Sequence, residues 1–272
     1  MDILSYPFMQ RALIAGVLVS ITCGVIGTYV VVRRMVFVSG GISHASFGGI
    51  GLGYFLGFDP VIGAMLFSVA SAVSIGAISR RARLPEDTSI GILWAVGMAL
   101  GVIFIGLSPG YAPDLFGYLF GNILSVSGAD LALMAALTVV IVVVVSLFFK
   151  EFQSLSFDEE FARVSGVPTA WLYYLLVVLI ALAVVILIRA VGIVLLIALL
   201  TIPAAISRRL VRSLRAMMLL SVALSALFVA SGLWLSYVLD LASGATIILV
   251  SGAAFLASLG LRRARGHSAQ PE

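Results

Sequence analysis

The chain has 272 residues, of which 62% are hydrophobic and only 10% are charged. Soluble domains carry a charge on about a quarter of their residues, so this composition excludes an ordinary water-soluble globule and indicates an integral membrane protein. The formal charge of +4 comes from 16 basic and 12 acidic residues, but the arginines stand in short clusters at the ends of apolar runs. That placement is typical of membrane topology and argues against nucleic-acid binding.

Apolar runs follow one another along the chain, and a membrane-spanning helix needs about 20 apolar residues. In chain order, the predicted spans are 12–32, 35–58, 61–79, 89–107, 131–149, 168–188, 191–206, 216–239 and 245–261. Pro203 interrupts the seventh run, which leaves an eight-span alternative open if that run is re-entrant. Pro109, Gly110 and Pro113 forbid a continuous helix after the fourth run, and we expect only a short interfacial or re-entrant helix over 115–126. The sequence therefore predicts an all-α polytopic fold of about nine spans.

The positive charges orient the predicted spans. Placing Arg33 and Arg34 in the cytoplasm and alternating the spans brings the other basic clusters to the same side. These clusters lie at 80–83, 150, 208–215 and 262–265. Arg189 is the one cation on the wrong side. The pattern predicts an external N-terminus, one transmembrane domain over 1–262 and a short charged cytoplasmic tail over 263–272.

The second run contains SGGISHASFGGIGLG, with one of the two histidines of the chain. His44 lies ten residues after Arg34, roughly 15 Å into a hydrocarbon core about 30 Å thick. Polar groups at that depth usually face a bundle interior or a water path. The helix face around His44 has little side-chain bulk and some hydroxyls. Its small residues are Gly40, Gly41, Ser43, Ser46, Gly48 and Gly51.

Two interpretations of His44 stay open on the residues alone. In the first, the imidazole hydrogen-bonds a neighbouring helix and the glycines allow close packing, as Gly49, Gly53 and Gly57 would on a second face. In the second, the imidazole lines an ion path and transiently ligates a cation. Neutral imidazole suits zinc, manganese and iron rather than alkali ions.

The longest polar stretch between spans ends in FDEEFARVSGV. Phe157, Phe161 and Val164 share one side at helical spacing, and three acids crowd the first turn, where they complement the helix dipole. Ser156 is the expected N-cap and Gly166 the expected stop. The pattern predicts a short cytoplasmic amphipathic helix. Interfacial helices usually carry Lys and Arg toward the headgroups, so this acidic helix favours docking onto a partner protein.

The sequence lacks the motifs that would let the chain drive transport or catalysis alone. It contains no G-x-x-x-x-G-K-[ST] phosphate loop, no H-E-x-x-H and no pair of acids inside the predicted spans. We therefore expect a transport protein rather than an enzyme, with any energy for uphill movement supplied by another subunit.

Five segments carry a family resemblance, and they run from the first span to the last. They are VVRRMVFVSGGISHASFGGIGLG (31–53), DLFGYLFGNILSVSGADL (114–131), SFDEEFARVSGV (156–167), LLIALLTIPAAISRRL (195–210) and DLASGATIILVSG (240–252). In this order they resemble the membrane permease subunits of the manganese/zinc/iron class of ABC importers. The resemblance implies a fold akin to that of the cobalamin and siderophore importers and a bacterial inner-membrane location. It also implies a homodimeric or paired permease, cytoplasmic ATPase subunits that bind the ATP, and an extracytoplasmic metal-binding protein.

The resemblance also implies roles for particular residues. His44 matches the histidine on the ion path of the family, and the small residues around it would line that path. The segment 156–167 would be the coupling helix that docks into a groove of the ATPase. Its residues are Phe157, Asp158, Glu159, Glu160, Phe161, Arg163 and Gly166. The divalent ion would be transported cargo, with no cofactor bound permanently.

Two positions depart from the family pattern. Many relatives carry an aspartate four residues before this histidine, where one helical turn would let both ligands converge, but here that position is Gly40. Ala242 stands where relatives often have proline. Without the carboxylate, the site in one subunit is weaker and less charged. We expect the His44 side chains of two protomers to meet near the dyad and form a transient relay.

The mechanism implied is alternating access driven by ATP hydrolysis on the partner subunit. The main alternative is an ion-coupled secondary transporter, which usually needs buried acids and often shows internal repeats. No clear repeat is visible, and the candidate acids lie at span ends: Asp59, Asp114, Asp130 and Asp240. An intramembrane enzyme using His44 as a base lacks a visible nucleophile. The motifs do not choose between zinc, manganese and iron.

Overall fold

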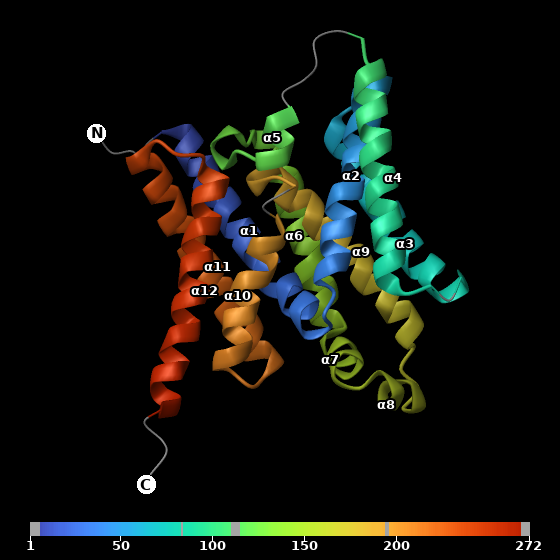
Figure 1. Cartoon of the computed structure of the whole chain (residues 1–272), viewed down its shortest axis with the longest axis vertical. Coiled ribbons are helices and arrows are strands. Elements are labelled where there is room, and N and C mark those ends of the chain that lie inside the picture. The colour runs from blue at the N-terminus through green and yellow to red at the C-terminus, as the bar shows by residue number, and fades with distance from the viewer. Residues whose placement is uncertain (1–5, 83, 110–114, 194–195, 268–272) are drawn as a thin grey trace.

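The computed structural model describes residues 6–82, 84–109, 115–193 and 196–267, and these residues form helices joined by short turns (Figure 1). The helices are α1 (Pro7–Val32), α2 (Val36–Leu56), α3 (Pro60–Ala82), α4 (Glu86–Leu107), α5 (Leu115–Phe120), the 3-10 turn η2 (Ile123–Ser125), α6 (Gly128–Leu147), α7 (Phe149–Phe157), α8 (Glu159–Val164), α9 (Thr169–Val191), α10 (Leu196–Leu210), α11 (Leu214–Leu239) and α12 (Ser243–His267). No strand occurs among the described residues. The predicted all-α fold is therefore confirmed.

Each predicted span corresponds to a helix in the described part of the chain. Within that part, six helices are long and apolar enough to cross a membrane, namely α1, α3, α4, α6, α9 and α11. Helix α2 has 21 residues, but its glycines, serines and histidine dilute its apolar character. Helix α10 has 15 residues and is about 22 Å long, shorter than the hydrocarbon core. The total of nine spans stays a prediction.

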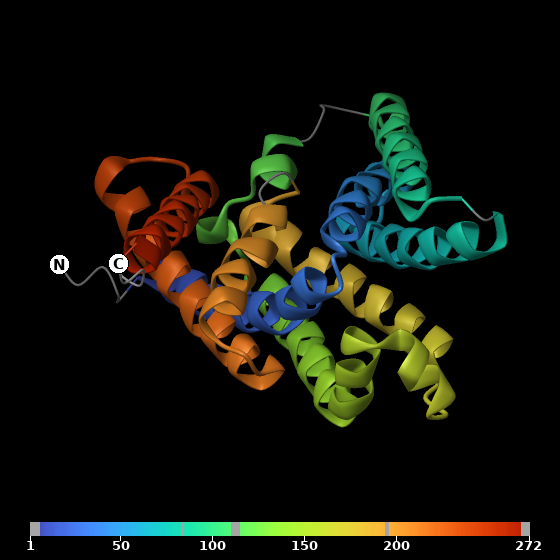
Figure 2. The same ribbon diagram turned by 60° about the horizontal axis from the view of Figure 1, so that its bottom comes forward.

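Helix α9 is the centre of the fold. It packs on α1 and α6 on one side and on α2 and α3 on the other, and Figure 2 shows α2, α3 and α4 as a group apart from α10, α11 and α12. Its middle is buried on almost every face, as Leu176, Val184 and Leu187 illustrate with no exposed surface. A helix that is apolar all round is suited to the middle of a bundle.

The segment after α4 is broken, as its prolines and glycines predict, although residues 110–114 lie outside the described residues. Helix α5 ends at Phe120, Gly121 adopts a left-handed φ of 65°, and η2 follows. The sequence predicted one short helix over 115–126, whereas the structure divides it at Gly121. The division lets Ile193 donate its backbone N–H to Tyr118 O at 3.0 Å, which fixes α5 against the end of α9.

Glycines on α2 bring its backbone against two other helices. A Cβ on Gly49 would lie 2.0 Å from Gly63 O of α3, and a Cβ on Gly51 would lie 2.5 Å from Gly101 O of α4. The predicted close approach at Gly49 is confirmed. Gly57 has a different role from the one predicted, since it is the left-handed C-cap of α2 with φ 74° and open space around it.

Replacing Gly49 by alanine is expected to lower the free energy of unfolding by about 1–3 kcal/mol, because the added methyl group must separate two backbones. Thermal unfolding of the purified chain in detergent measures the effect. The matched control is Gly91→Ala in α4, where a Cβ meets nothing within 4 Å. Alanine should be neutral or mildly stabilising there. Equal effects of the two substitutions would contradict the packing argument.

Candidate functional site

The imidazole of His44 is half-buried on α2 and stacks on the indole of Trp94 from α4. The ring centroids are 4.2 Å apart and the planes differ by 6°. The Nδ1 atom of His44 is buried and has no hydrogen-bond partner among the described residues. The ring is therefore held by a π-stack, and one nitrogen keeps an unused lone pair or N–H group.

The glycines that share the face of His44 contact neighbouring helices within the same chain. A Cβ on Gly40 would lie 2.8 Å from Ile197 Cδ1 of α10, and one on Gly41 would lie 2.4 Å from Ile90 Cγ2 of α4. At Gly48 the nearest atom is Phe67 Cε1 of α3, at 2.7 Å. These positions thus have a packing role in the single chain. Their place along an ion path stays a prediction.

The serines beside His44 satisfy their hydroxyl groups within α2. Ser43 Oγ donates to Gly40 O at 2.7 Å, and Ser46 Oγ donates to Ser43 O at 2.5 Å. Both side chains are buried. Their hydroxyl oxygens can still accept a hydrogen bond or contact a cation, because each uses only its proton in these bonds.

The polar loop contains two short helices, and the sequence anticipated only the second. Helix α7 buries Phe152 and Leu155 against the bundle. These two apolar residues are three positions apart, a helical spacing that could have indicated α7 from the sequence. The predicted N-cap at Ser156 is wrong, because Ser156 Oγ donates to Phe152 O at 2.6 Å. Asp158 caps α8 instead, its Oδ1 accepting from Phe161 N at 2.8 Å.

The predicted apolar side is exposed, although Phe157 is the last residue of α7 and only Phe161 and Val164 belong to α8. Phe157, Phe161 and Val164 are 67%, 66% and 89% exposed. The helix ends where expected, with Ser165 as its C-cap and Gly166 at φ 84°. Helix α7 therefore anchors the loop, and its last residue, Phe157, is exposed together with Phe161 and Val164 of α8.

An ion pair that sequence reasoning missed joins this loop to the corner between α1 and α2. Arg33 Nη2 lies 3.0 Å from Glu159 Oε2, and Arg33 Nη1 donates to Leu155 O. The side chains of Arg33 and Glu159 are 13% and 34% exposed. From the sequence alone, Arg33 served only to orient the spans, and Glu159 was expected only to face a partner protein. Glu160, by contrast, is exposed.

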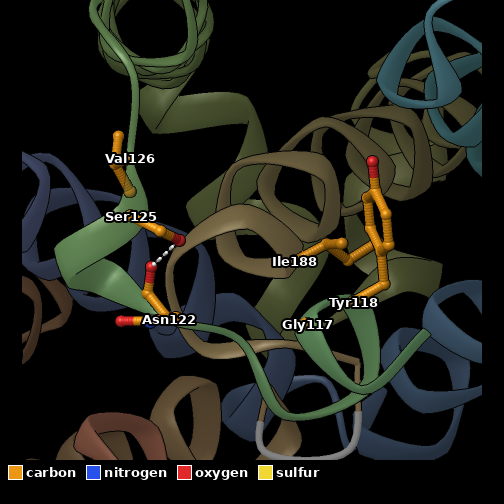
Figure 3. Close-up of a pocket in the computed structure, with 6 residues that line it drawn as sticks. All are labelled: Gly117, Tyr118, Asn122, Ser125, Val126 and Ile188. Carbon is orange, nitrogen blue, oxygen red and sulfur yellow. Dashed lines mark hydrogen bonds between the residues drawn. The ribbon is translucent and has the colours of Figure 1, made fainter. Parts of the chain in front are cut away.

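A small cavity lies near the opposite end of the bundle from α8 (Figure 3). Its volume is about 110 Å³, and its lining residues are Gly117, Tyr118, Asn122, Ser125, Val126 and Ile188. Ser125 Oγ donates to Asn122 O at 2.8 Å across one wall. All six residues are uncharged, so the cavity suits a few water molecules rather than a tightly held metal ion.

The described residues contain no group of three or more His, Cys, Asp or Glu side chains that could hold a metal ion. Among the residues that the structure describes, the His44 nitrogen is therefore not part of such a ligand group. Water, backbone oxygens or a second copy would have to complete the coordination shell of an ion there.

Comparison with known proteins gives the class of the chain. Residues 5–262 match the model of the ABC 3 transport family. An uncharacterized membrane protein of Synechocystis sp. is 47% identical over 260 residues, covering 96% of this chain and 92% of that one. The manganese transport system membrane protein MntC of Listeria monocytogenes is 37% identical, covering 92% of this chain and 89% of that one. The structure of PsaBC from Streptococcus pneumoniae in complex with Fab gives a TM-score of 0.85 at 36% identity, covering 93% and 91%.

The chain belongs to the ABC 3 transport family and is a permease subunit of the metal ABC importer type, as the sequence motifs predicted. It is a multi-pass protein of the bacterial inner membrane.

The Arg33–Glu159 ion pair should stabilise the fold measurably. In a double-mutant cycle with Arg33→Gln and Glu159→Gln, we expect a coupling free energy of about 1 kcal/mol. This value lies at the upper end of the range for surface ion pairs, because both side chains are partly buried. Arg163 is the matched control: it is 3.8 Å from Glu159 Oε1 and 67% exposed, so its coupling should be near zero. Equal coupling free energies for Arg33 and Arg163 would contradict the prediction that the ion pair at the end of α1 stabilises the fold more than an exposed pair does.

Proposed function

We propose that this chain is the transmembrane subunit of an ATP-driven importer for a divalent transition-metal ion, with manganese the first metal to test and zinc and iron(II) next. The family assignment supports the transporter class, and the 37% identity to a manganese transport protein along 92% of the chain supports the metal. The observation that carries the proposal is the unpartnered imidazole nitrogen of His44 in the middle of α2.

His44 acts as a transient ligand in this mechanism. Gly40 supplies no carboxylate one turn away, and the space beside it is occupied by Ile197. A site with one imidazole and no acid binds weakly, which suits an ion that must leave again toward the cytoplasm. The His44 side chains of two copies, meeting near a dyad, would pass the ion between them.

Helix α8 is the docking surface for a separate ATPase. The exposed ring of Phe161, Glu160 and the exposed ring of Phe157 at the end of α7 would contact a groove on that subunit. Closure of the ATPase dimer would displace α7 and α8 together, and Arg33 would carry the displacement to the corner from which α2 and His44 begin. An extracytoplasmic metal-binding protein would deliver the ion at the other end of the bundle.

The acids of the described residues do not favour the secondary-transporter alternative. Asp130 belongs to a capping box with Ser127 at the start of α6, and Asp59 Oδ1 accepts from Val61 N at the start of α3. Asp240 is the exposed C-cap of α11. Acids that cap helix ends are poor carriers for a coupling ion, which needs a carboxylate inside the membrane.

A metal ion at His44 should change the fluorescence of Trp94. In a chain carrying Trp171→Phe and Trp234→Phe, paramagnetic manganese is expected to quench the remaining indole, because that indole stacks on the ligand. His44→Phe keeps an aromatic ring but removes the nitrogens, so it should abolish the quenching and lower metal uptake into vesicles by about tenfold or more. Unchanged uptake would contradict the role of His44, while quenching without ATP-dependent uptake would contradict the importer.

The exposed side of α8 should control association with the ATPase. Glu160→Arg and Phe161→Ala are each expected to reduce co-purification of the ATPase and metal-stimulated ATP hydrolysis in proteoliposomes, with no change in the melting temperature of the chain. Asp87→Arg, another exposed acid, should have no such effect. If the two α8 variants hydrolyse ATP as the parent does, α8 is not the coupling surface.

A further inference from the structure

A groove between α6 and α11 is not used by the proposed transport mechanism. Both helices pack on α1, and the groove runs between them with a volume of about 370 Å³. Its walls are almost entirely apolar. Its lining includes Ser146 of α6, Phe149 at the start of α7, and Arg215 and Leu219 of α11.

One end of the groove carries a positive charge. Arg215, in the first turn of α11, places its guanidinium 4.8 Å from the centre of the Phe149 ring, and the side chain is exposed. Among the described residues, Arg215 has no salt bridge to an acid. Glu151, the acid nearest to Phe149 in sequence, does not line the groove. The guanidinium can therefore contact an anion at this end of the apolar groove.

This end of the groove lies at the basic end of the bundle. Helix α7, helix α8 and the C-terminal end of α10 lie together there (Figure 1). Arg208 and Arg209 are in the last turn of α10, and Lys150 is in α7. By the positive-inside rule this end faces the cytoplasm, so the groove opens toward the inner leaflet.

We propose that the groove binds one acyl chain of an anionic phospholipid of the inner leaflet, with the lipid phosphate on Arg215. Basic pockets between spans on the cytoplasmic side are suited to anionic headgroups. Ser146, the other polar lining residue, can donate to an ester or phosphate oxygen.

Native mass spectrometry of the full chain in detergent tests the proposal, with dioleoyl phosphatidylglycerol and dioleoyl phosphatidylcholine as probes of identical acyl chains. The parent chain should prefer phosphatidylglycerol by about fivefold, the contribution of one basic residue near an anionic surface. Arg215→Gln should reduce this preference to near one. Arg212→Gln, an exposed arginine outside the groove, should retain it.

The acyl chain is tested separately from the headgroup. Leu219→Trp fills the groove from an exposed position and should lower the binding of both lipids while leaving the melting temperature of the lipid-free chain unchanged. Equal losses for Arg215→Gln and Arg212→Gln, or normal lipid binding by Leu219→Trp, would overturn the proposal. A disulfide between two copies carrying Ser146→Cys would also overturn it, because a second chain would then cover the groove.

Discussion

The direct contact between the backbones of α2, α3 and α4 is the constraint on which the rest of the structure depends. Gly49 and Gly63 face each other across α2 and α3, while Gly51 of α2 faces the backbone of Gly101 in α4. In a bilayer no hydrophobic force drives apolar helices together, so close packing at small residues must supply the attraction. Helix α2 can therefore be rich in glycine and still be held firmly between α3 and α4, with a histidine in its middle.

A second link connects this glycine-packed group to the polar loop. Arg33 contacts both the α7 backbone at Leu155 and the carboxylate of Glu159. Because Arg33 directly follows α1 and precedes α2, a shift of the loop acts on two long helices at once. The adjacent Arg34 adopts a left-handed φ of 59°, so the chain turns sharply here. Helix α2 begins at Val36, so only Arg34 and Met35 separate Arg33 from it.

The fold was largely predictable because its signals are local. Apolar run length located the helices, the prolines and Gly121 divided the segment after α4, and Gly166 ended α8. The candidate site was predictable only in part. His44 stood out as a lone imidazole in an apolar run, but its Trp94 partner depends on how α2 and α4 are rotated against each other. The Arg33–Glu159 pair joins residues 126 positions apart, and no periodicity marks it. The choice of Asp158 over Ser156 as the cap depended on α7, which the sequence analysis did not separate from the loop.

The parallel stack of His44 on Trp94 restricts the direction from which a ligand can approach the imidazole nitrogen. The lone pair of an imidazole nitrogen lies in the plane of the ring, and the 6° angle between the rings makes that plane parallel to the indole. A cation can therefore reach the nitrogen only along a line running beside the indole face, and one side of the ring is closed to any ligand. The stack thus fixes the plane of the imidazole, and with it the direction from which any ligand can approach the ring nitrogen.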